Sequence, residues 1–142
     1  MSKFIIPMAL CLMLFFVVSL LSDDYNKEKA RKLFIEQCSK CHRKDGRGIK
    51  GVYPPVKNSD YIQKGDKIEL LRGMIFGRSG KIVVNDEVYY GVMITEIDKN
   101  LSDSDVALIL EYVLKELNGM NVEVTEKDVA KARKEGKLPV HK

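Results

Sequence analysis

The sequence is sparing with the residues on which several kinds of fold and site depend. Its 142 residues include four prolines, three cysteines, two histidines and no tryptophan. Hydrophobic residues make up 45% and charged residues 31% of the sequence. Together with the low proline content, this composition excludes a disordered or collagen-like chain. Internal repeats and low-complexity stretches are also absent, so the length indicates a single domain.

Hydrophobic residues are scarce once the first 22 positions are set aside. After Ser22, 47 of the remaining 120 residues are hydrophobic, about 39%. A chain of this length folds in water, but so lean a core predicts a covalent or ligand-borne supplement such as a disulfide, a metal or a cofactor.

The hydrophobic excess lies at the amino terminus, where residues 4–21 are interrupted only by Pro7 and Ser19 and follow Lys3. Such a run predicts export, with residues 1–22 acting either as a cleaved signal peptide or as an uncleaved membrane anchor. The protein is then periplasmic or tethered to the outer face of the cytoplasmic membrane. Cys11 is interpreted as an apolar filler of this segment.

Periodicity and capping residues predict a mainly helical body. Glycines and Pro54-Pro55 make residues 43–57 a loop, and residues 81–93 are compatible with either a short hairpin or an extended loop. The expected helices cover residues 26–41, a short turn at Tyr61, residues 66–76 ending at Gly77, residues 102–117 and residues 125–133.

The most informative segment is Cys38-Ser39-Lys40-Cys41-His42. Residues i, i+3 and i+4 share one face of a helix, so two thiols and an imidazole point the same way. Two thiols in this arrangement can add to the vinyl groups of a haem while the histidine binds its iron. The pattern predicts one covalently bound haem c.

Two other chemistries use the same residues. A structural disulfide or a thioredoxin-like dithiol between Cys38 and Cys41 needs only the C-x-x-C part, but the redox motif belongs in a βαβ context that is absent here. A zinc site needs four ligands, and beyond these three residues the remaining candidate is His141 in the carboxy-terminal tail.

A second axial ligand is expected if His42 binds the iron, and the candidates are Met74, Met93, Met120 and His141. Met93 is preferred because it follows Tyr89-Tyr90-Gly91, where the backbone can approach a flat cofactor closely. A neutral thioether favours reduced iron and leaves no open site for a substrate. The predicted protein is thus an electron carrier and not an enzyme.

Several separated segments resemble class I cytochrome c of the bacterial, monohaem type. They are Ala30 and Phe34 before the Cys38-x-x-Cys41-His42 motif, the segment from Asp45 to Val56, residues 90–93, and Leu110-Glu111-Tyr112-Val113. The resemblance implies an all-α fold wrapped round one haem, with a cytochrome domain at 23–118 and a carboxy-terminal extension at 119–142.

The same resemblance assigns roles to individual residues. His42 and Met93 become the axial ligands, and the carbonyl of Pro54, or else of Pro55, accepts the proton of the far histidine nitrogen. Ala30 and Phe34 are expected to pack against Ile109 and Tyr112 where the first and last long helices cross. The residues after Met93 lack the prolines and glycines common in relatives, so a differently shaped ligand loop is expected.

Charge is distributed unevenly along the body. Residues 38–67 hold eight basic and three acidic residues, whereas residues 85–128 hold three basic and eleven acidic ones. A basic collar near the haem predicts redox partner proteins with acidic docking patches, and mixed charge argues against nucleic acid. No small-molecule substrate is expected.

Two alternatives for the function remain open. One is an electron-input subunit of a larger oxidoreductase, and the other is a haem sensor or enzyme with an open axial site.

Overall fold

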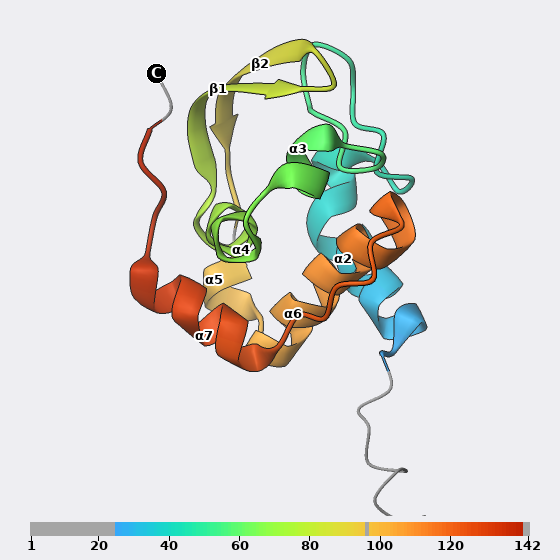
Figure 1. The fold of residues 1–142 in the computed structure, drawn as a ribbon, viewed down its shortest axis with the longest axis vertical. Helices are drawn as coiled ribbons and strands as arrows, with labels where there is room; N and C mark the ends of the chain where they lie inside the picture. The colour runs from blue at the N-terminus through green and yellow to red at the C-terminus, as the bar shows by residue number, and fades with distance from the viewer. Residues whose placement is uncertain (1–24, 96, 141–142) are drawn as a thin grey trace, which may run out of the picture.

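The chain folds into several helices, with a two-stranded hairpin and a long irregular loop at the top of the view in Figure 1. The computed structural model describes residues 25–95 and 97–140. The predicted export segment 1–22, with Cys11, lies outside the described residues, as does His141. Within the described residues, no helix combines the length and hydrophobicity needed to cross a membrane.

Two long helices cross on one side of the molecule, as Figure 1 shows: α2 (Lys27–His42) and α6 (Asp103–Tyr112). Ala30, Phe34 and Tyr112 are buried in one hydrophobic cluster at this crossing. The rings of Phe34 and Tyr112 lie with centroids 5.3 Å apart. Ala30 and Phe34 thus pack with Tyr112, as the resemblance implied, while Ile109 is fully buried but lies outside this cluster.

A second hydrophobic cluster lies between α4 (Lys67–Phe76), α6 and α7 (Glu126–Glu135). The carboxy-terminal segment therefore contributes to the core. Arg72 of α4 also holds the tail, since its Nε atom donates to the Gly136 carbonyl at 2.7 Å and its Nη2 atom to the Lys137 carbonyl at 2.8 Å. The buried members of the cluster are Ile68, Leu70, Leu71, Ile75, Ile97, Val106, Ala107, Leu110, Leu114, Val124, Val129 and Ala132.

Polar side chains cap the helices at their amino-terminal ends. Asn26, Ser59, Asp66, Ser102 and Thr125 each accept a backbone N–H of the following first turn. Each cap satisfies an amide that the helix itself leaves without a partner. The short helix α3 (Asp60–Lys64) begins after one of these caps. A further short helix, α5 (Ile97–Asn100), was not predicted.

Residues 78–93 form an antiparallel hairpin, which settles the choice that the sequence left open. Strand β1 (Arg78–Val84) pairs with β2 (Glu87–Met93). Asn85 and Asp86 make the turn with φ angles of 51° and 64°, the positive values that a tight hairpin turn needs at both central positions.

The predicted helix 102–117 is continuous, but its last part differs from an α-helix. After Tyr112 it becomes η2 (Val113–Leu117), a π-helical turn that ends at Asn118. Such turns are rare and occur mostly as single widened turns within longer helices.

Candidate cofactor site

The carboxy-terminal end of α2 carries Cys38, Cys41 and His42 at the spacing that places them on one helix face. The two cysteines are half-buried free thiols. Burial, together with the neighbouring Cys41, raises the pKa of the Cys38 thiol to about 12. Cys38 therefore stays protonated near neutral pH.

His42 is buried, with 8% of its surface exposed, and its Nδ1 atom lies 2.8 Å from the Pro54 carbonyl oxygen. A carbonyl can only accept, so Nδ1 carries the proton and Nε2 keeps its lone pair. Burial lowers the pKa of His42, while the bond to Pro54 acts in the opposite direction. The result is a neutral imidazole with a free ligand nitrogen.

The loop that follows α2 depends on Gly48 to reach Pro54. Gly48 has a φ of 65°, and its N–H donates to the His42 carbonyl at 2.9 Å. A Cβ atom at this position would overlap the Tyr53 carbonyl oxygen and lie 2.7 Å from the Pro54 carbonyl oxygen. Only glycine combines this backbone conformation with so close an approach.

The hairpin forms the wall across the cavity from α2 and the loop. Its register pairs Arg78 with Met93, Gly80 with Gly91 and Ile82 with Tyr89, and all six residues line the cavity. Alternate residues of a strand share a face. A Cβ atom added at Gly91 would meet nothing within 4 Å. The strands thus leave open space for a flat group beside Gly91.

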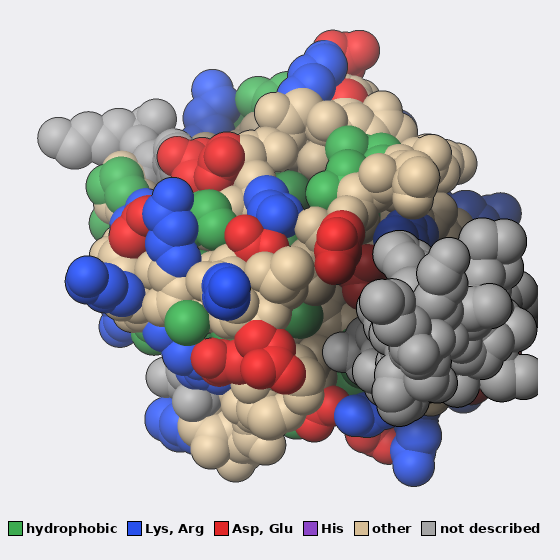
Figure 2. All heavy atoms as spheres, turned by 60° about the horizontal axis from the view of Figure 1, so that its bottom comes forward, with side chains coloured by type: hydrophobic (Ala, Val, Ile, Leu, Met, Phe, Trp, Pro, Cys, Tyr) green, Lys and Arg blue, Asp and Glu red, His purple; other side chains and the backbone are tan. Residues whose placement is uncertain are grey.

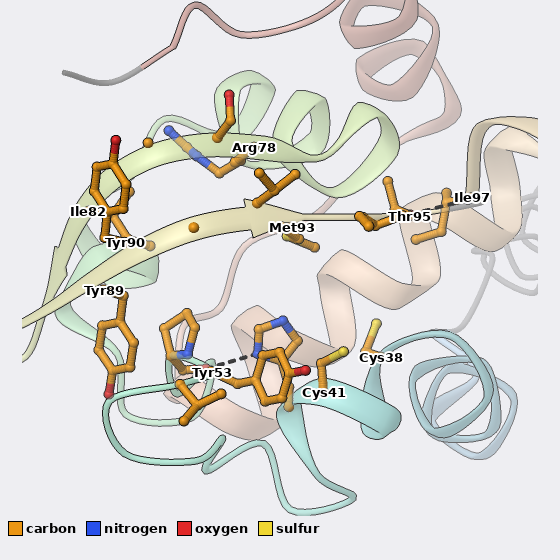
Figure 3. Close-up of a pocket in the computed structure, with 18 of the residues that line it drawn as sticks. Cys38, Cys41, Tyr53, Arg78, Ile82, Tyr89, Tyr90, Met93, Thr95 and Ile97 are labelled. Carbon is orange, nitrogen blue, oxygen red and sulfur yellow. Dashed lines mark hydrogen bonds between the residues drawn. The ribbon is translucent and has the colours of Figure 1, made fainter.

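Met93 and His42 both lie where two cavities, of about 260 and 110 Å³, meet. Figure 3 shows Met93 at the end of β2, facing across the larger cavity the side that carries Cys38, Cys41 and Tyr53. The residues shared by both cavities are Cys38, His42, Pro54, Arg78, Ile82 and Met93. The structure thus places Cys38, Cys41, His42, Pro54 and Met93 around one cavity.

These residues fit a haem. The cavity offers two thiols, a neutral imidazole, a thioether and an open space beside Gly91, lined largely by apolar side chains. Among the described residues, no group of three or more His, Cys, Asp or Glu side chains is placed to hold a bare metal ion.

Of the other candidate ligands, the structure describes Met74 and Met120. Met74 is partly buried against the second hydrophobic cluster and lines only the smaller of the two cavities. Met120 packs against the same cluster and lines neither cavity. Both positions are those of packing residues.

Sequence reasoning missed one charged residue of the cavity wall. The Arg78 guanidinium lies 5.0 Å from the centre of the Tyr61 ring, and Arg78 lines both cavities. A guanidinium in an apolar wall is suited to bind a carboxylate. Its position at the start of β1 follows from the hairpin register, which no local pattern had established.

Comparison with known proteins agrees with this site. A family model described as Cytochrome c matches residues 27–116. Cytochrome c-552 of Thermus thermophilus is 31% identical over 80 residues, which cover 54% of this chain and 60% of that protein. A second cytochrome c-552 of the same species is also 31% identical over 80 residues, with 53% of its length covered. The chain thus spans little more than half the length of these relatives.

The matched region contains the Cys38–His42 motif, Pro54, the hairpin and the α2–α6 crossing. The predictions of a class I cytochrome c fold and of a covalently attached haem c are confirmed, the hairpin being an addition to the helical architecture. The chain belongs to the cytochrome c family, as a class I monohaem member whose cofactor is haem c.

Proposed function

We propose that the protein carries single electrons through a haem iron bound by His42 Nε2 and Met93 Sδ. One observation supports this most: both side chains line both cavities, one from the end of α2 and one from the end of β2. When bound, the haem supplies a reversible one-electron couple. Both side chains are neutral ligands, and if His42 and Met93 both held the iron no position would remain there for a substrate.

The remaining residues of the site hold these two in place. Cys38 and Cys41 attach the cofactor through thioether bonds. Pro54 fixes the orientation of the His42 ring and increases its basicity by accepting from Nδ1 at 2.8 Å. Met93 is held by the hairpin, where it pairs with Arg78.

Replacement of the proposed methionine ligand tests the function. In the holoprotein, Met93→Ala should abolish the methionine-to-iron charge-transfer band and allow carbon monoxide to bind the reduced protein. Met74→Ala is the matched control, because Met74 packs against the hydrophobic cluster, and it should keep the band. A wild-type protein that binds carbon monoxide readily would instead support the sensor or enzyme alternative.

We also infer that the chain is exported and either periplasmic or tethered through residues 4–21. The support is the apolar run after Lys3. Cell fractionation of the full-length protein, followed by mass determination, distinguishes a cleaved soluble form from an anchored one. Recovery of the holoprotein in the cytoplasm would contradict export.

A partner-docking surface is proposed beside the cavity. Exposed apolar residues surround its mouth: Val52, Tyr53, Tyr90, Val92 and Ile94. The adjoining loop adds the exposed basic residues Arg43, Lys44 and Arg47. An apolar centre with a positive border fits a redox partner whose docking patch is acidic.

A further inference from the structure

Asn118, at the end of η2, joins the last long helix to the loop that holds His42. Its Nδ2 atom donates to the carbonyl oxygens of Val56 at 2.7 Å and Val113 at 2.8 Å. Its Oδ1 atom accepts the backbone N–H of Ser59 at 2.9 Å. Both amide protons of the side chain are therefore used, and two of the three bonds reach a segment about sixty residues away in the chain.

The loop between α2 and α3 also has hydrogen bonds of its own. Ile49 and Tyr53 form an isolated bridge, and the N–H groups of Val56 and Lys57 donate to the Gly46 carbonyl at 2.8 and 2.9 Å. The Asn58 N–H donates to the Leu117 carbonyl at 3.0 Å, beside the bonds of Asn118. The end of η2 thus holds residues 56–59 by three hydrogen bonds, two of them from one side chain.

A displacement at Val56 is transmitted to Pro54. The rings of Pro54 and Pro55 fix the φ angle of both residues, and the residue before a proline is restricted as well. Few torsions are therefore free to absorb a movement between the Val56 carbonyl and the Pro54 carbonyl. The Val56 N–H lies between these two carbonyls along the chain and donates to the Gly46 carbonyl at 2.8 Å, so Val56 is held at both its N–H and its carbonyl.

The π-helical turn is part of this arrangement. In η2 the Val113 carbonyl accepts the Asn118 side chain at 2.8 Å, and the same side chain extends to the loop. Widened turns of this kind occur frequently at functional sites.

We propose that Asn118 is a positioning residue for the axial ligand His42, acting through Val56 and Pro54 without touching the cofactor. The inference rests on the proposed function, because it treats His42 as the iron ligand. Loss of the Asn118 bonds loosens the Pro54 carbonyl, weakens its bond to Nδ1 and makes His42 a poorer electron donor to iron.

The test uses the full-length holoprotein with Asn118→Ala. In the oxidised protein, the Nδ1 proton of His42 should exchange with deuterated solvent about tenfold faster, as expected for the loss of a net hydrogen bond. In a redox buffer at fixed potential, the ratio of reduced to oxidised protein should rise about threefold, because a weaker histidine donor favours reduced iron. NMR measures the proton exchange, and absorption measures the ratio of reduced to oxidised protein.

Two controls separate positioning from stability alone. Thr125→Ala removes the capping box of α7, far along the chain from the loop, and should lower the melting temperature without changing either readout. Gly48→Ala introduces a Cβ atom against the Pro54 carbonyl and should reproduce both changes directly.

A second variant keeps the proposal testable if Asn118→Ala fails to bind haem. Asn118→Asp retains the acceptor for Ser59 but loses both N–H donors. It should behave as the alanine variant at neutral pH and recover toward wild type at acid pH, where the introduced carboxyl gains a proton to donate.

The inference about Asn118 would be overturned if both Asn118 variants left the proton exchange and the redox ratio unchanged while Gly48→Ala changed both. That result would leave the proposed function untouched. An oxidised wild-type protein without a histidine-bound, low-spin iron would overturn the proposed function instead.

Discussion

At the scale of single residues, burial in the cavity keeps two titratable groups neutral by opposite shifts. It raises the pKa of Cys38 to about 12 and lowers the pKa of His42. Desolvation disfavours the charged form of any group. The same surroundings therefore raise the pKa of an acid such as the Cys38 thiol and lower the pKa of a base such as the His42 imidazole. The cavity therefore presents neutral thiol, imidazole and thioether groups to an apolar cofactor.

Arg78 is the charged exception in that wall, and Gly73 makes room for it. A Cβ atom at Gly73 would lie 3.0 Å from Arg78 Cδ, so the arginine side chain crosses α4 at the position without a side chain. There its guanidinium stacks over Tyr61 at 5.0 Å. The stacking holds one positive charge at the junction of the two cavities.

At the scale of elements, the hairpin is fastened at its turn. The Asn85 N–H donates to Asp60 Oδ1 at 2.7 Å, and Asn85 Oδ1 accepts the Asp60 N–H at 2.9 Å. Asn85 Nδ2 also donates to the Asn58 carbonyl at 3.0 Å. The turn that carries β2 toward Met93 is therefore tied to the start of α3.

Asn85→Gly should destabilise the holoprotein by about 1 kcal/mol, because two side-chain hydrogen bonds are lost while glycine accepts the positive φ. Asp86→Gly is the matched control, since Asp86 has the same kind of backbone conformation. It should be neutral or slightly stabilising. Urea unfolding of both variants measures the difference, and equal losses would show that the clamp to Asp60 contributes nothing.

These hydrogen bonds of Asn85 explain why the sequence left both a hairpin and an extended loop open for residues 81–93. Helices and their caps were predictable because Ser59, Asp66, Ser102 and Thr125 act within four residues of their own positions. The choice between hairpin and loop depended on bonds about 25 residues away in the chain. Local patterns carry no such information.

The candidate site divides in the same way. The Cys38–His42 motif and Met93 could be identified from local spacing, and the role of Pro54 from the family resemblance. Asn118 could not, because its bonds to Val56 and Ser59 join distant segments. In the sequence, Asn118-Gly119 indicates only a helix end, and the short α5 went unpredicted as well.

At the scale of the whole molecule, the charge bias along the chain predicts a basic surface beside the cavity. The exposed basic residues Arg43, Lys44 and Arg47 lie in the loop beside the cavity. Within that loop Arg47 lies 3.7 Å from Asp45, and Lys67, farther along the chain, is paired with Asp128 at 2.7 Å. On the face that carries α6 and α7, brought forward in Figure 2, acidic and basic side chains are interspersed.

Reaction with small charged oxidants should reveal this asymmetry without a protein partner. The reduced holoprotein should react with hexacyanoferrate(III), an anion, at a rate that falls as salt is added, and with tris(phenanthroline)cobalt(III), a cation, at a rate that rises.

Replacing both Lys44 and Arg47 by Gln should slow the reaction with the anion about two- to fourfold, the effect of removing two screened charges near the site. The control replaces Lys127 and Lys131, exposed on α7, by Gln and removes the same net charge. Stopped-flow absorption measures all four rates. Equal slowing in both pairs would mean that net charge alone, and not a basic surface at the cavity, governs the approach of a negatively charged partner.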